Sequence, residues 1–161
     1  AYWSAVAKDA GTQLVPEQLP SLRQWDVEMW AHENPSMVEW LKQIHSSGTR
    51  TGLLSNMPHD MIRHVRQQFA WLEYFDHQTF SAEVQLIKPD AAIYEHSLRG
   101  VEVRASEALF VDDKEPNVKG ALAVGMRAIQ FQSVEQFRND LDQLGFPELP
   151  ASALPPASGR T

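Results

Sequence analysis

Short apolar runs alternate with amphipathic segments from about residue 49 to residue 145. Two runs, "EALFVDD" (107–113) and "MRAIQF" (126–131), are rich in branched and aromatic residues and predict β-strands. The run "TRTGLLSN" (49–56) predicts a third strand, and "HQTFSA" (77–82) a weaker fourth. These four segments are the candidate strands of a sheet.

Helical periodicity fills the intervals between these runs. In "HDMIRHVRQQF" (59–69), Met61, Ile62, Val65 and Phe69 fall near one face of a helix. "KPDAAIYEHSL" (88–98) predicts a helix with Pro89 in its first turn, where the missing N–H costs nothing. Three further helices are predicted over 33–48, 115–125 and 133–145, the last from Ser133 to Gly145.

This alternation predicts an α/β fold with a parallel sheet that is covered by helices on both faces. The sequence divides into part of a helical cap over residues 1–34, a core over 35–146 and a tail over 147–161 that is rich in Pro, Ala and Ser. In such a fold, functional groups gather at the carboxyl ends of the strands. The chemistry is therefore expected after residues 55 and 112.

Composition narrows the class of partner. The 161 residues carry a formal charge of -7, and this acidic balance argues against nucleic-acid and anionic-membrane surfaces. The chain has no cysteine, which excludes disulfides and thiolate chemistry. No apolar run approaches the roughly 20 residues of a membrane helix, and no signal peptide is visible. We expect a soluble, cytoplasmic protein with a small-molecule partner.

Polar residues with suggestive chemistry follow three of the strands. Ser55 and Asn56 could hold a phosphoryl oxygen through a hydroxyl and neighbouring N–H groups. Lys88 could neutralise a carboxylate and a phosphate together. Asp112 and Asp113 repel each other, and a Mg²⁺ ion would compensate both charges. Taken singly, each has a plain alternative: a turn, a surface charge or a solvated acidic loop.

As an ordered set, these residues resemble the motifs of the haloacid dehalogenase-like hydrolase superfamily over residues 35–144. Its second motif matches "TGLLSN" with Ser55, and its third matches "IKPDAAIYEHSL" with Lys88. Its fourth matches "ALFVDDKEPNVKGALAVGM", which contributes the residues Asp112, Asp113, Asn117 and Gly120.

The resemblance implies a Rossmann-like sheet and an aspartate nucleophile that takes a phosphoryl group with Mg²⁺ as cofactor. It implies that Ser55 and Asn56 bind the phosphate and that Lys88 holds nucleophile and phosphate in register. Asp112 would help to hold Mg²⁺, with Asp113 supporting the metal or its waters, and Asn117 would pin the loop. The expected activity is a Mg²⁺-dependent phosphatase on a small phosphorylated metabolite such as a sugar phosphate.

The superfamily's first motif, a strand that ends in Asp-x-Asp, has no match. The nearest string, "AVAKDAGT", offers Asp9 but has Ala7 where the first acid should stand, so the nucleophile is unknown. In the family this strand lies between the strands that end at Ser55 and Asp112. We expect it to be absent from the sequence, and to be supplied by residues outside it, by another copy or by rearrangement; a homo-oligomer formed by strand exchange is one such case.

Several alternatives remain open. A metal-independent haloacid dehalogenase would use the same nucleophile, but it leaves the acid pair without a purpose. A phosphoacceptor module of the receiver type would carry its acids first, whereas this chain carries them last; a catalytically inactive binding module is a further alternative. His59 could touch a substrate or be a solvated first-turn residue. Trp25, Trp30 and His32 could line a pocket or form the core of the cap.

Overall fold

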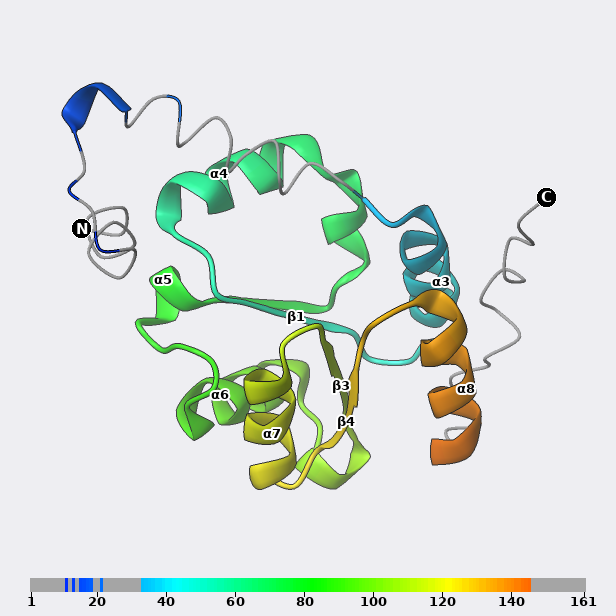
Figure 1. The fold of residues 1–161 in the computed structure, drawn as a ribbon. Coiled ribbons are helices and arrows are strands. Elements are labelled where there is room, and N and C mark those ends of the chain that lie inside the picture. The colour runs from blue at the N-terminus through cyan, green and yellow to red at the C-terminus, as the bar shows by residue number, and fades with distance from the viewer. Residues whose placement is uncertain (1–10, 12, 14, 19–20, 22–32, 146–161) are drawn as a thin grey trace. The chain divides into compact units, whose positions relative to one another are not determined.

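The computed structural model describes residues 11, 13, 15–18, 21 and 33–145 (Figure 1). The chain divides into two compact units, Ala1–Glu33 and Asn34–Thr161, and the first contains the short 3-10 helix η1 (Pro16–Gln18). The predictions for Asp9, for the cap residues Trp25, Trp30 and His32, and for the tail lie outside the described residues. The second unit carries the α/β pattern.

Helices and strands alternate through the second unit as the sequence predicts. Their order is α3 (Pro35–Ser46), β1 (Gly52–Ser55), α4 (His59–Gln68), η2 (Ala70–Tyr74), β2 (His77–Phe80), α5 (Ser81–Val84), α6 (Ala91–Val101), η3 (Ala105–Glu107), β3 (Leu109–Asp112), α7 (Glu115–Ala123), β4 (Arg127–Gln130) and α8 (Val134–Leu144). The short elements η2, α5 and η3 were not predicted, because segments of three to five residues leave no periodic pattern.

The strands are parallel, and among the described residues they form two separate pairs. β1 pairs with β2 in the register Leu54 to Thr79, and β3 pairs with β4 in the register Val111 to Ile129. The α/β class with parallel strands is confirmed. Within residues 33–145, no strand is hydrogen-bonded between β1 and β3, which is the position of the family's first strand that the sequence was expected to lack.

Alternate residues of the β3–β4 pair face two different apolar clusters. Leu109, Val111 and Ile129 pack with α3 and α8, whereas Phe110 and Ala128 pack with α6 and α7. Side chains on a strand alternate between its two faces, so an apolar run such as "LFV" supplies both clusters at once. The pair is therefore covered by helices on both sides (Figure 1).

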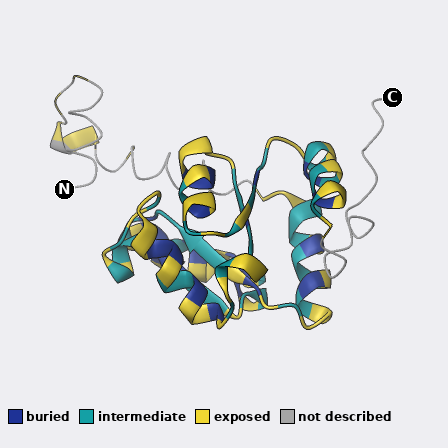
Figure 2. Cartoon of the chain, turned by 90° about the horizontal axis from the view of Figure 1, so that it is seen from below, coloured by how far each residue is buried: buried dark blue, intermediate teal, exposed yellow. Residues whose placement is uncertain are grey.

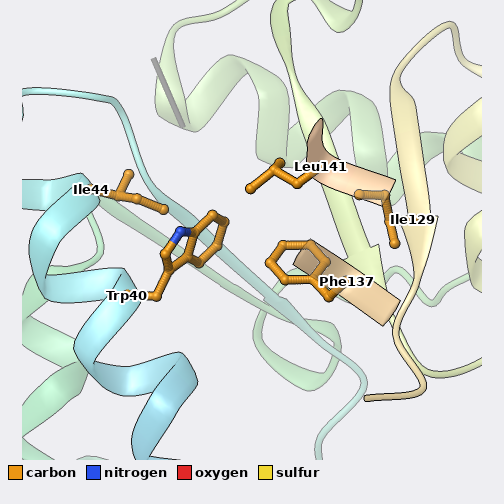
Figure 3. Packing of buried hydrophobic residues seen from close by; sticks show 5 residues of the cluster. All are labelled: Trp40, Ile44, Ile129, Phe137 and Leu141. Carbon is orange, nitrogen blue, oxygen red and sulfur yellow. The ribbon is translucent and has the colours of Figure 1, made fainter. Parts of the chain in front are cut away.

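One of these clusters joins α3 to α8. Trp40 and Ile44 from α3 contact Ile129 of β4 together with Phe137 and Leu141 of α8 (Figure 3). The rings of Trp40 and Phe137 meet edge to face with centroids 5.0 Å apart, an arrangement favoured by aromatic quadrupoles. The buried residues follow one face of each helix, while exposed residues occupy the outer face (Figure 2).

Helix boundaries follow the capping residues, with one correction. Ser133 caps α8 by accepting a hydrogen bond from the Gln136 N–H at 3.1 Å, and Gly145 ends it at φ 64°, as predicted. α6, however, begins at Ala91 rather than near Lys88. Lys88 and Pro89 lie in the preceding turn. Proline disfavours helical backbone angles at the residue before it, which here is Lys88. Lys88 therefore lies outside the helix.

In the part of the chain that is described, no helix combines the length and the apolar character that crossing a membrane requires.

The α3–α8 cluster gives a first prediction. Phe137 is fully buried, so Phe137→Ala should lower the free energy of unfolding by about 3–5 kcal/mol in urea denaturation followed by circular dichroism. Leu122→Ala is the matched control, because Leu122 is 52% exposed and its truncation should change stability by no more than about 0.5 kcal/mol. Equal losses for the two variants would contradict the packing described.

Candidate active site

Lys88 links the carboxyl ends of the two strand pairs. Its ammonium donates to the Leu54 carbonyl of β1 at 2.9 Å and to Asp112 Oδ2, the last residue of β3, at 2.6 Å. The side chains of Lys88 and Asp112 are only 8% and 7% exposed. An ammonium has three N–H donors, and these bonds occupy two of them. One donor is thus left for a further group at the strand ends.

Asp112 is held as a carboxylate by several donors. Its Oδ1 accepts from the Lys114 N–H at 2.8 Å and from Asn117 Nδ2 at 2.9 Å, while Oδ2 accepts from Lys88. Burial on its own would raise the pKa of Asp112, but the hydrogen bonds from Lys88, Lys114 and Asn117, with the charge of Lys88, outweigh it and lower this pKa. The cation beside Asp112 is therefore the lysine.

Asp113 has different surroundings. It is exposed, and its carboxylate makes no hydrogen bond or ion pair with the described residues; only its backbone carbonyl accepts a bond, from Gln130 Nε2 at 3.0 Å. The two neighbouring acids thus differ, since Asp112 is neutralised by Lys88 and the Asp113 carboxylate has no partner among the described residues. The sequence shows only that the two acids are neighbours, and it could not show that they have different partners.

Asn56 uses its side chain to hold the turn that carries Lys88. The Lys88 N–H donates to Asn56 Oδ1 at 2.9 Å, and Asn56 Nδ2 donates to the Lys88 carbonyl at 3.0 Å. The neighbouring Ser55 hydroxyl makes no hydrogen bond with the described residues. Of the three residues predicted to bind phosphate, Ser55, Asn56 and Lys88, only Ser55 has a side chain without a hydrogen-bond partner among the described residues.

A second layer supports Asp112 from α6 and α7. Asn117 is buried, and its carbonyl accepts from the Tyr94 hydroxyl at 2.8 Å while its side chain donates to Asp112. Burial, followed by the negative charges of Asp112 and Asp90, raises the pKa of Tyr94 to about 12, so its hydroxyl remains a donor. Sequence reasoning missed Tyr94, although its position on the buried face of the predicted helix was visible.

Ser81 is another residue that sequence reasoning missed. It follows β2, and its hydroxyl accepts from the Met57 N–H at 3.0 Å. Met57 is the next residue after Asn56 and is buried, so this bond braces the turn beyond β1. The predicted contact residue His59 lies at the start of α4 and is exposed.

The described residues contain no group of three or more histidine, aspartate or glutamate side chains that could hold a metal. Asp113 nevertheless offers one free carboxylate. Mg²⁺ commonly takes one or two protein carboxylates and completes its shell with waters and substrate phosphate. The chemistry of Asp113 therefore fits that of one protein ligand in such a shell.

This geometry agrees with a family match that spans most of the chain. The model of the haloacid dehalogenase-like hydrolases matches residues 6–125, which include Ser55, Lys88 and the acid pair. The chain belongs to this hydrolase family. The resemblance drawn from the motifs is thereby confirmed.

Similar proteins include both phosphatases and dehalogenases. The sesquiterpene phosphatase astK of Aspergillus oryzae is 34% identical over 90 residues, which are 56% of this chain and 46% of that protein. The (S)-2-haloacid dehalogenase 1 of a Pseudomonas species is 26% identical over 102 residues, 63% of this chain and 45% of that protein. Among solved structures, a HAD phosphatase from Thermococcus onnurineus is 25% identical with a TM-score of 0.52, and the match covers 74% of this chain and 47% of that one.

The chain spans less than half the length of each of these three relatives. The match to residues 6–125 shows the family, and the reaction and substrate of the whole protein are proposed below.

The buried ion pair gives a second prediction. Asp112→Asn would leave the Lys88 ammonium buried without a counter-charge, so the free energy of unfolding at pH 7 should fall by about 3 kcal/mol in urea denaturation. The double variant Lys88→Met with Asp112→Asn should lose less than the sum of the two single variants, because it removes both charges. Additive losses would contradict the pairing.

The lowered pKa of Asp112 gives a third prediction. Because the pKa is lower in the folded chain than in the unfolded chain, ionised Asp112 adds stability above the unfolded value of about 3.9. This contribution is lost as the pH falls through the folded pKa. The slope of stability against pH below about pH 4 should accordingly be shallower in Asp112→Asn than in the parent protein. Equal slopes of stability against pH in the two proteins would show that folding does not change the pKa of Asp112.

Proposed function

We propose that the protein is a Mg²⁺-dependent phosphatase that hydrolyses small phosphorylated metabolites. One observation carries the proposal: the Lys88 ammonium joins the end of β1 to the end of β3 through the Leu54 carbonyl and Asp112. Ser55 and Asp113 follow these two partners directly in the chain, and their side chains make no hydrogen bond with the described residues. A phosphoryl group needs donors for its oxygens and a cation for its charge, and these residues supply or bind each of them. Relatives that are named as phosphatases support this assignment.

Each residue has a role in the proposed reaction. The Ser55 hydroxyl donates to a phosphoryl oxygen. The third N–H of Lys88 stabilises the charge that builds up between the nucleophile and the phosphate. Asp112 keeps that ammonium in position, and Asn117 orients Asp112. The nucleophile is an aspartate outside the described residues, as the family resemblance implies.

Asp113 is the proposed ligand of the metal. Its carboxylate is free, whereas each oxygen of Asp112 already accepts a bond from a nearby donor. This differs from the role that the motif alone suggested for Asp112. When bound, Mg²⁺ supplies positive charge that lowers the repulsion between an anionic nucleophile and a phosphate ester.

A haloacid dehalogenase is the second candidate, and the similarity to the Pseudomonas dehalogenase favours it. That reaction, as the family resemblance implies, needs no metal. The free carboxylate of Asp113 argues against it, because a dehalogenase site would gain nothing from an unneutralised acid beside its anionic substrate. For the phosphatase, sugar phosphates are the proposed substrate class, and the similarity to a sesquiterpene phosphatase makes isoprenyl phosphates the comparison to assay.

Activity measurements on the complete protein give a fourth prediction. It should release phosphate from p-nitrophenyl phosphate with Mg²⁺ and lose this activity in excess chelator. Asp113→Asn should lower kcat/KM by at least about 100-fold, and added Mg²⁺ should restore activity only in part. Glu115→Gln is the matched control, since Glu115 pairs with Lys119 on the exposed side of α7 and should have no effect.

One outcome would overturn the phosphatase, and another would overturn the role of Asp113. Release of halide from 2-chloropropionate at an undiminished rate in chelator would identify a dehalogenase. Full phosphatase activity in Asp113→Asn would remove Asp113 from the metal site.

A further inference from the structure

The turn that carries Lys88 is closed by one backbone hydrogen bond, from the Asp90 N–H to the Ile87 carbonyl at 2.9 Å, and this bond does not involve the Lys88 N–H or carbonyl. Lys88 lies between α5 and α6, outside any helix or strand. A lysine side chain is a flexible stem of four carbons, so the position of the ammonium is well defined only if the backbone of the lysine is also fixed. Among the described residues, the Lys88 N–H and carbonyl are hydrogen-bonded by one side chain alone, that of Asn56.

The chemistry of these two bonds identifies the residue type that the position requires. The Lys88 N–H needs an acceptor and the Lys88 carbonyl needs a donor, and a primary amide presents both on one planar group. The bonds, at 2.9 and 3.0 Å, can form only with Oδ1 toward the N–H and Nδ2 toward the carbonyl. Aspartate could satisfy the first bond and not the second, and alanine could satisfy neither.

These contacts use Oδ1 and one N–H of the Asn56 amide, so the orientation of this side chain is set by the Lys88 backbone. We propose that Asn56 is a positioning residue that fixes Lys88 through its backbone, and that its side chain is not a phosphate ligand. The proposal deepens the proposed function and rests on it for the role of Lys88. Asn56 follows Ser55 directly, so the end of β1 positions both the Ser55 hydroxyl and the turn that carries Lys88. The phosphate-binding Ser55 and the charge-stabilising Lys88 are thereby held in a fixed relation to each other.

The proposal is tested by measuring how fast the Lys88 amine reacts. In the parent chain the Lys88 side chain is 8% exposed and paired with Asp112, so acylation by a water-soluble acetylating reagent should be slow. Asn56→Ala should accelerate acylation of Lys88 by roughly 5- to 30-fold, the factor expected when one or two such hydrogen bonds are lost. The rate for each lysine is read by peptide mass spectrometry.

The chain supplies its own controls. Lys42 lies over the Tyr74 ring and Lys119 pairs with Glu115 on the surface of α7, so the rates of both should stay unchanged unless the whole fold loosens. Asp112→Asn should accelerate Lys88 directly, because it removes the counter-charge. Ser55→Ala changes the neighbouring residue without touching these bonds, and it should leave Lys88 protected.

Asn56→Asp is the second variant. It is needed if Asn56→Ala raises the acylation rate of every lysine, because that result would mean that the alanine variant unfolds. Asn56→Asp retains the acceptor for the Lys88 N–H and loses the donor to the carbonyl, so it should accelerate Lys88 less than the alanine variant does. A folded Asn56 variant in which Lys88 reacts at the parent rate would overturn the proposal. The measurement needs no turnover, so absence of phosphatase activity would refute the proposed function without deciding this inference.

Discussion

The buried ion pair between Lys88 and Asp112 is the interaction on which the arrangement of the site depends. Removing two charges from water costs several kcal/mol for each ion, and the cost is offset only when the remaining donors and acceptors are also satisfied. Here the Leu54 carbonyl, the Lys114 N–H and Asn117 complete the pair. Because β1 and β3 share no ladder of hydrogen bonds, Lys88 is also a physical link between the two strand pairs.

This requirement accounts for residues that touch no proposed ligand. Asn117 must orient its amide toward Asp112, and the Tyr94 hydroxyl fixes the start of α7 that carries it. α7 must also lie close to the Lys88 turn. A Cβ at Gly120 would come within 2.7 Å of the Pro89 carbonyl and 2.8 Å of the Tyr94 hydroxyl, so only glycine allows this approach. A charge pair at the strand ends thus dictates side chains on two helices.

The sequence predicted the order of helices and strands well, and it predicted the long-range contacts only in part. Periodicity and capping residues are local, so Ser133 and Gly145 marked the ends of α8 correctly. The predicted start of α6 lies three residues early, because Pro89 belongs to the turn before the helix rather than to its first turn. The pattern could not show that Asn56 turns toward Lys88, 32 residues away, or that Asp112 and Asp113 have unequal partners, since both facts arise from packing.

The balance of charge at the strand ends bears on the choice between the two candidate reactions. Lys88 contributes one positive charge, while Asp112 and Asp113 contribute two negative charges, so these three residues sum to minus one. A phosphate ester brings further negative charge to a partly buried site, where repulsion is stronger than in water. A cation at Asp113 would reverse the sign of the residual charge and so favour binding of such a substrate. Without one, the lysine is already neutralised by Asp112 and cannot offset Asp113 as well. The Asp113 carboxylate would therefore favour substrate binding in the proposed metal-assisted phosphate hydrolysis and would oppose an anionic substrate in a metal-free reaction.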